Sequence, residues 1–153
     1  MKKEILVFIF NGYADWEPAY VCAELNSSDT DYIVRTISLD KNPKVSMGGF
    51  HVLPDYSIAD YPANFSLLIL AENGFLNEIK HSGNTLEFMK SQAPHYKGDK
   101  NFLEEQAVCD ANIITANGSG TLEFAKKILT LLNAKSEQAI TDWYNLNKYG
   151  FYQ

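Results

Sequence analysis

The chain has 153 residues, a length typical of one domain with a substantial buried core, so we expect a single domain over residues 1–153. With 46% hydrophobic and 21% charged residues the composition is that of a soluble globular protein, and the apolar runs are too short to cross a bilayer. A formal charge of −6 with scattered lysines argues against a nucleic-acid partner, because that binding depends on a basic face. No small-residue cleavage site follows the first apolar stretch, so we expect no signal peptide, no membrane partner and a cytoplasmic location.

The cysteines and histidines do not indicate a metal site. The two cysteines, Cys22 and Cys109, form neither a disulfide framework nor a metal-ligand spacing. The three histidines, at positions 51, 81 and 95, are dispersed, and none stands beside a carboxylate at ligand spacing. We therefore expect no metal ion and no cofactor.

The first element is an apolar strand over residues 4–10, which ends at a turn formed by Asn11-Gly12. An apolar run without alternation is typical of a parallel strand covered on both faces. Pro18 suits the first position of a helix that continues through Leu25, since its missing N–H would have no partner there. Glu17 is then expected at or beside the N-cap of this helix.

Glu17 has two interpretations. In open α/β sheets the ligand crevice lies beyond the carboxyl ends of the strands, where a carboxylate can act as an acid, a base or a hydrogen-bond partner. The alternative is that Glu17 only complements the helix dipole, since acidic residues are common in first helical turns. Taken alone, these residues favour the second interpretation.

The next elements predict an α/β fold. A strand over residues 32–38 follows the helix, and such a unit builds a parallel sheet with a right-handed crossover. Residues 46–55 predict a short hairpin-like excursion with a turn at Gly48-Gly49. Residues 65–70 predict another buried strand.

The residues directly after Leu70 do not continue this pattern. Ala71-Glu72 resembles the last turn of a helix, and Asn73-Gly74 resembles its C-cap. No helix of adequate length precedes them. The sequence therefore predicts that a segment is missing at this junction.

The second half of the chain predicts three helices and a pair of strands. A capping-box-like start at Asn84 opens a short helix that ends before Pro94. Strands over 107–110 and 112–115 meet at a tight turn, and residues 117–120 form a glycine turn rather than a phosphate site. A helix over 121–133 places Glu123 and Lys127 as an exposed pair. A last helix over 137–148 ends in an aromatic tail that is expected to dock on the core or on a second subunit.

Two further residue types were candidates for chemistry. Among the histidines, His81 is the one expected to face the crevice and contact substrate, although an ordinary loop histidine is the favoured alternative. A nucleophilic cysteine needs a sharp strand-to-helix turn or a helix N-terminus to lower its pKa. Neither Cys22, inside the first helix, nor Cys109, in a strand, has that setting, so both are expected to be small buried residues.

Several segments, in order and covering most of the chain, resemble the PfpI family of the class I glutamine amidotransferase-like superfamily, which includes the Parkinson-disease-associated deglycase. They are Phe10-Asn11-Gly12-Tyr13-Ala14-Asp15-Trp16-Glu17, Gly48-Gly49 with Pro54-Asp55, and Ile113-Ile114-Thr115-Ala116-Asn117-Gly118 with Leu122-Glu123-Phe124-Ala125. Three others are similar to the bacterial type 1 glutamine amidotransferase-like branch: Lys80-His81-Ser82-Gly83-Asn84, Pro94-His95-Tyr96-Lys97-Gly98 and Trp143-Tyr144.

The resemblance implies a flavodoxin-like, three-layer α/β/α sandwich with a mostly parallel sheet. In the family, a catalytic cysteine on a nucleophile elbow is hydrogen-bonded to the glutamate that Glu17 matches. A Gly-Gly turn after the strand matching residues 65–70 helps to form the oxyanion hole, and the elbow follows one helix and one strand later. None of this block is present after Leu70, so on the order of 40 to 50 residues are missing, the nucleophile among them.

Two explanations remain open for this gap. Either the intact protein has an internal stretch that this chain lacks, or the chain is a deleted relative that folds without the elbow. The first is favoured, because removing a central strand and its covering helices would expose apolar faces and edges.

The resemblance implies a cysteine-dependent hydrolase, amidotransferase or deglycase that acts on a small molecule or a peptide. Family members are often dimers, which makes a homodimer one expectation. This chain itself is expected to be inactive, because the elbow cysteine is absent. The alternative is a non-catalytic α/β binding or structural module that keeps the crevice.

Overall fold

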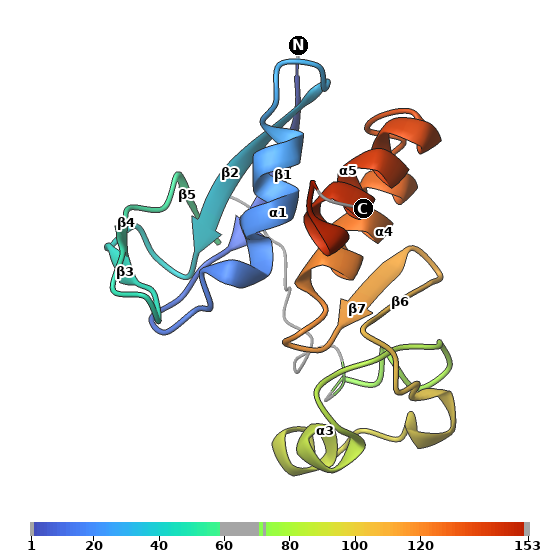
Figure 1. Ribbon diagram of the computed structural model, residues 1–153. Helices are drawn as coiled ribbons and strands as arrows, with labels where there is room; N and C mark the ends of the chain where they lie inside the picture. The colour runs from blue at the N-terminus through green and yellow to red at the C-terminus, as the bar shows by residue number, and fades with distance from the viewer. Residues whose placement is uncertain (1, 59–70, 72, 152–153) are drawn as a thin grey trace. The chain divides into compact units, whose positions relative to one another are not determined.

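The computed structural model in Figure 1 describes residues 2–58, 71 and 73–151. The chain forms two compact units, Met1–Phe65 and Ser66–Gln153. The predicted strand over residues 65–70 lies outside the described residues. A single domain over the whole length stays a prediction.

The first unit is a βαβ structure extended by a hairpin and a short third strand. Strand β2 lies between β1 and β5 in a three-stranded sheet, and both pairings are parallel. The elements are β1 (Lys3–Phe8), α1 (Trp16–Leu25), β2 (Tyr32–Ser38), β3 (Lys44–Val45), β4 (His51–Val52) and β5 (Tyr56–Ser57). The predicted α/β class and the bounds of the second strand are therefore confirmed.

Strand β1 is less buried than its apolar run predicts. Residues 5–8 are only half-buried, whereas Ile9, whose N–H donates to the Ile37 carbonyl at 2.8 Å, is buried. Among the described residues β1 pairs with β2 alone, so its other edge has no described strand partner. A run of this composition is typical of a parallel strand covered on both faces.

A hairpin is present as predicted, but it spans residues 44–52 and not 46–55, and its turn lies one residue before the predicted Gly48-Gly49 turn. Strands β3 and β4 are antiparallel, with Lys44 opposite Val52 and Val45 opposite His51, and the chain turns at Met47-Gly48. Just after the predicted junction at Leu70 and Ala71, Gly74 has a φ of +80°, and its N–H donates to the Ala71 carbonyl at 3.1 Å. This is the left-handed conformation expected of a glycine just after a helix end.

The described residues of the second unit form a hairpin, three α-helices and a short 3-10 helix. Its elements are α3 (Leu86–Gln92), the 3-10 helix η1 (Asp99–Asn101), β6 (Ala107–Asp110), β7 (Ile113–Ala116), α4 (Thr121–Leu131) and α5 (Glu137–Tyr149). A buried cluster around α3 forms part of its core: Ala71, Leu76, Met89, Ala93 and Tyr96. The N-cap of α3 is Thr85 and not Asn84, because the Thr85 hydroxyl accepts the Phe88 N–H at 3.0 Å.

Strands β6 and β7 form the predicted antiparallel pair. The two residues between them, Ala111 and Asn112, have φ values of 47° and 63°. Positive φ at both positions is the signature of a type I′ turn, which matches the twist of the flanking strands.

Helices α4 and α5 pack against each other through a polar contact that the sequence does not reveal. The predicted pairing of Glu123 with Lys127 is wrong. Glu123 instead accepts hydrogen bonds from the Tyr144 hydroxyl at 2.9 Å and from the Lys148 ammonium at 2.5 Å, both on α5. These partners belong to another element, so the i,i+4 rule within one helix does not find them.

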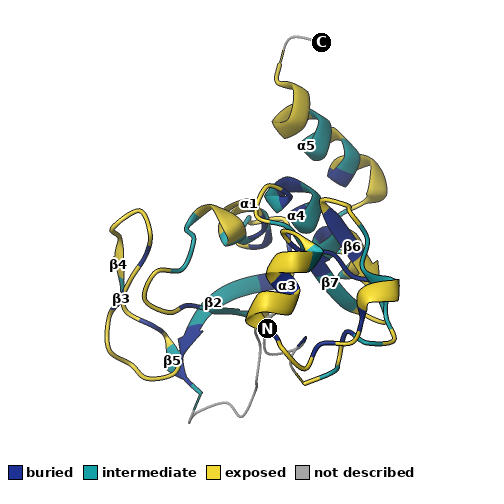
Figure 2. Ribbon diagram, turned by 90° about the horizontal axis from the view of Figure 1, so that it is seen from below, coloured by how far each residue is buried: buried dark blue, intermediate teal, exposed yellow. Residues whose placement is uncertain are grey.

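The aromatic tail does not dock on the core of the described chain. Figure 2 shows α5 exposed along much of its length, and Ile140 is its only buried residue. Tyr149 is 63% exposed and Phe151 is 85% exposed. Docking on a second subunit stays a prediction.

None of the described helices combines the length and the apolarity that a membrane crossing requires.

Candidate active site

Glu17 lies at the junction between β1 and α1, where the sequence predicts it. Helix α1 begins at Trp16 with Asp15 as its N-cap, so Glu17 is the second helical residue and Pro18 the third. The prediction that Pro18 opens the helix is therefore wrong by two positions. The whole first turn tolerates proline, because the first N–H groups of a helix have no intrahelical acceptor.

Hydrogen bonds fix the loop before α1 against the β3–β4 hairpin. The Gly12 N–H donates to the Val45 carbonyl at 2.7 Å. The Val45 N–H donates to the side-chain oxygen of Asn11 at 3.0 Å. The Met47 N–H donates to the Tyr13 carbonyl at 2.9 Å. The backbone that carries Glu17 is therefore held from both sides of the turn.

Asp15 adds a fourth contact that sequence reasoning missed. Its carboxylate accepts the Gly48 N–H at 2.7 Å and makes no capping bond to α1. A Cβ at Gly48 would lie 2.8 Å from that carboxylate oxygen, so the contact requires glycine. A hydrogen bond from Ser46, together with the Gly48 N–H, lowers the pKa of Asp15 against the opposing effect of desolvation. An acid at a helix start suggests capping, and nothing local indicates a partner 33 residues away.

The Glu17 carboxyl has no such partners. Within the described residues it accepts no hydrogen bond and forms no ion pair, and the residue as a whole is exposed. Loss of hydration around the carboxyl nevertheless raises its pKa. The group is thus a carboxyl at a helix N-terminus with its bonding capacity unused.

His81 is fully buried in the second unit, where the sequence predicts a residue that faces the crevice. Its Nδ1 lies 2.7 Å from the Ile79 carbonyl, and its Nε2 lies 2.6 Å from the Tyr96 hydroxyl. The rings of Tyr96 and Phe102 pack edge-on against it, with centroids 5.5 and 5.8 Å away. A substrate could reach a ring nitrogen only by breaking one of these bonds, so the predicted substrate contact gains no support from this geometry.

The two cysteines differ from each other. Cys22 is partly buried in α1, and desolvation raises its pKa to about 11. It stands five residues after Glu17, about 140° away around the helix axis. Cys109 is exposed, so the prediction that it is buried is wrong. It lies one residue from the end of β6, next to the hairpin turn, where less of the unit covers it.

The Asn117 to Gly120 segment is the glycine turn that the sequence predicts. The Asn117 side-chain oxygen accepts the Ser119 N–H at 3.0 Å, and the Asn84 side-chain oxygen accepts the Gly118 N–H at 2.8 Å. These amides already have acceptors and leave little capacity for a phosphate. Within residues 2–58, 71 and 73–151 no group of three histidine, cysteine or acidic side chains could hold a metal ion.

The parallel sheet, the crossover helix and a carboxylate at the first strand-to-helix junction define an α/β protein of the flavodoxin-like class. A family model described as the DJ-1/PfpI family matches residues 3–94. The chain belongs to the DJ-1/PfpI family.

Three relatives illustrate the similarity. The uncharacterized protease YdeA of Bacillus subtilis is 35% identical over 188 residues, which cover 98% of this chain and 93% of YdeA. The uncharacterized protease YoaZ of the same organism is 27% identical over 191 residues, with 95% and 91% covered. The crystal structure of a ThiJ/PfpI family protein from Bacillus anthracis has a TM-score of 0.86 at 30% identity and covers 97% of this chain and 92% of that one.

The alignments to YdeA and YoaZ contain gaps in this chain. Both sequence alignments, of 188 and 191 residues, are longer than the 153 residues of the chain. Each therefore includes positions at which the relative has residues and this chain has none.

Proposed function

We propose that this chain carries the acid half of a cysteine-dependent hydrolase site and, without a nucleophile, can bind a small-molecule or peptide substrate but cannot turn it over. The observation that carries this proposal is the unengaged Glu17 carboxyl at the junction of β1 and α1. A carboxyl in this position with a raised pKa suits hydrogen bonding to a thiol or a carbonyl group. The names of YdeA and YoaZ as proteases support hydrolytic ancestry.

Neither cysteine of the chain suits the role of nucleophile. Cys22 is turned away from Glu17 around α1, and with a pKa of about 11 it is almost wholly a thiol at neutral pH. Cys109 lies within a hairpin strand and not at a strand-to-helix turn. A nucleophile elbow presents its side chain on such a turn, next to a base.

We place the missing nucleophile in a block absent between Leu70 and Ala71. Three observations support this location. The alignments to relatives are longer than the chain, Gly74 has the left-handed conformation typical of a glycine that follows a helix, and β1 has one edge without a described partner. A strand, a helix and an elbow inserted there would supply the nucleophile, would account for the longer alignments and would give β1 a second partner strand.

Thiol labelling tests the proposal. We expect iodoacetamide to label Cys22 at least about 100-fold more slowly than free cysteine at neutral pH, because its thiolate fraction is small. Cys109 should react at an ordinary rate, and Glu17→Gln should change neither rate. Peptide mapping by mass spectrometry identifies the labelled residue. A single rapidly labelled cysteine that loses its reactivity in Glu17→Gln would show an assembled catalytic pair and overturn the proposal.

A purely structural role for Glu17 is the second candidate, favoured by its place in the first turn of α1, where a carboxylate stabilises the helix dipole. In that case Glu17→Gln lowers the melting temperature and leaves the affinity for peptides or small carbonyl compounds unchanged. In the binding proposal the affinity falls instead.

A further inference from the structure

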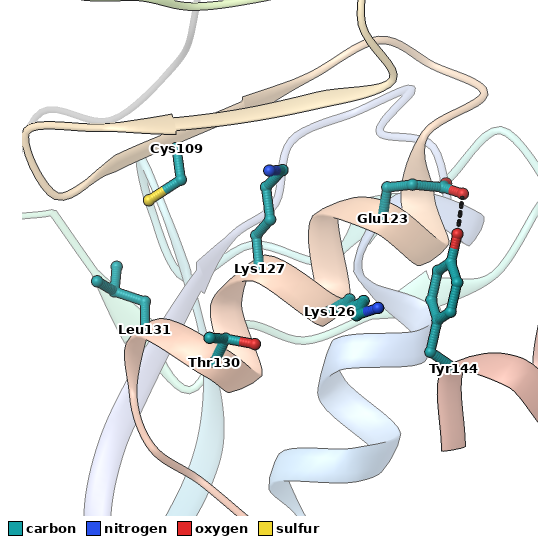
Figure 3. Close-up of a pocket in the computed structure, with 7 residues that line it drawn as sticks. All are labelled: Cys109, Glu123, Lys126, Lys127, Thr130, Leu131 and Tyr144. Carbon is teal, nitrogen blue, oxygen red and sulfur yellow. Dashed lines mark hydrogen bonds between the residues drawn. The ribbon is translucent and has the colours of Figure 1, made fainter. Parts of the chain in front are cut away.

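A cavity of about 500 Å³ in the second unit is lined by none of the residues assigned above to the Glu17 site. Figure 3 shows its walls: Cys109 comes from β6, Lys126, Lys127, Thr130 and Leu131 from α4, and Tyr144 from α5. This volume is within the range of small-molecule sites. The long side chain of Lys127 extends from α4 toward the β6–β7 hairpin, on the side where the Cys109 thiol lies.

The one acidic side chain of the cavity wall, Glu123, is already paired with a positive charge. Glu123 accepts hydrogen bonds from Tyr144 at 2.9 Å and from Lys148 at 2.5 Å. Burial opposes ionisation of Glu123, but these bonds outweigh it and lower its pKa, so the carboxylate stays charged and paired. Glu123 therefore contributes little free negative charge to the cavity.

The two lysines of the wall leave positive charge available. The Lys126 ammonium lies 4.2 Å from the centroid of the Tyr144 ring, a cation–π contact that positions the charge without cancelling it. Lys127 is half-buried and forms no ion pair with any described residue. In a chain with a net charge of −6, this is a local reversal of sign.

The remaining wall combines apolar surface with uncharged polar groups. Leu131 and the Tyr144 ring offer apolar contact, while the Thr130 hydroxyl and the Cys109 thiol can donate hydrogen bonds. Lysine stems add further apolar surface beside their charges. Such a wall matches a ligand with a charged head and an apolar body.

We propose that this cavity binds a small organic anion, with a carboxylate or phosphate head attracted by the lysines of its wall, Lys126 and Lys127, and an apolar body against Leu131 and Tyr144. Carboxylate and phosphate heads share the chemistry that the lysines recognise. The two are separated by comparing 1-naphthoate with 1-naphthyl phosphate, and 1-naphthylmethanol serves as the neutral compound of similar shape.

The exposed Cys109 thiol provides a reporter inside the cavity. In the full chain carrying Cys22→Ala, we expect Lys127→Gln to slow labelling by the anionic disulfide 5,5′-dithiobis(2-nitrobenzoate) about fivefold. Labelling by the neutral 4,4′-dithiodipyridine should change less than about twofold. Lys97→Gln, an identical charge change at an exposed residue outside the cavity, is the matched control and should leave both rates near those of the parent.

Protection by ligand completes the test. Naphthoate or naphthyl phosphate should slow labelling of Cys109 by the neutral reagent saturably, at millimolar concentrations or below, and the double variant Lys126→Gln/Lys127→Gln should lose this protection. Equal protection by naphthylmethanol, an equal effect of Lys97→Gln, or no protection at about 10 mM of either anion would each overturn the proposal.

Discussion

At the scale of single residues, the hydrogen-bond partners of His81 show which ring nitrogen carries the hydrogen. The Ile79 carbonyl can only accept, so Nδ1 of His81 carries the hydrogen and donates to it at 2.7 Å. Nε2 then accepts from the Tyr96 hydroxyl at 2.6 Å. Desolvation and the charge of Asp99 raise the pKa of Tyr96 to about 12, which keeps this hydroxyl protonated. Both nitrogens of the buried ring therefore have hydrogen-bond partners.

Removal of the Tyr96 hydroxyl should cost stability. We expect Tyr96→Phe to lower the free energy of unfolding by about 1 to 3 kcal/mol, because it leaves a fully buried His81 nitrogen without a donor. Tyr149→Phe, which removes the same atom from a residue that is 63% exposed, should be nearly neutral. Urea unfolding at pH 7 measures both variants. Equal stability of the two would show that the bond to His81 contributes nothing.

This residue also shows where sequence reasoning stops. The polar stretch Lys80-His81-Ser82 is typical of a loop, and the sequence predicts a histidine near the crevice. The structure buries it because Tyr96 and Phe102, 15 and 21 residues away, fold over it. Glu17 could be placed from the sequence, since a strand end, a turn and a proline are all local signals. The partners of His81 and of Asp15 depend on tertiary packing and carry no local signal.

At the scale of elements, the Glu123 carboxylate is the main polar link between α4 and α5. Its pKa is lowered, so the sign of its contribution is defined: the stabilisation is complete above the unfolded value of 4.5 and is lost as the pH falls through the folded value. Desolvation acts in the opposite direction and is outweighed by the bonds from Lys148 and Tyr144. The contribution should therefore be absent in acid.

Replacement of this carboxylate gives a pH-dependent prediction. We expect Glu123→Gln to destabilise the chain by about 1 kcal/mol at pH 7 and by less at pH 3, because the parent carboxyl becomes protonated as the pH falls through its folded pKa. Glu105→Gln, in an exposed loop, is the matched control and should have little effect at either pH. Denaturant unfolding followed by far-UV circular dichroism reports the difference. A loss of the same size at both pH values would contradict the electrostatic origin of the link.

Elements themselves were predictable where the signal is local. Strand β2 has the predicted bounds, and α5 differs from its prediction by one residue at its end. The starts of α1 and α3 shifted, because several neighbouring polar residues can cap a helix and tertiary contacts select among them. Asp15 caps no N–H since Gly48 occupies its carboxylate, and Thr85 takes the role expected of Asn84.

At the scale of the whole molecule, the apolar run of β1 is inconsistent with an edge position. Ile5, Leu6, Val7 and Phe8 are half-buried, and the sheet continues from β1 on one side only among the described residues. An edge strand of this composition promotes association between chains. Both alignments to relatives include residues that this chain lacks, and we propose that such residues supply a further strand beside β1.

The final prediction concerns mass and cooperativity. If the intact protein carries the absent block, the natural polypeptide should be longer than this chain by roughly 40 to 50 residues. Its mass should therefore exceed 17.3 kDa. It should unfold in one calorimetric transition whose van't Hoff and calorimetric enthalpies agree, as a single domain does. A 153-residue polypeptide made from this sequence should lose that agreement, because the chain divides into two compact units that we expect to unfold separately. A natural polypeptide of 17.3 kDa with one cooperative transition would show instead that the chain folds without an elbow. Strand β1 would then be an edge strand that the fold tolerates.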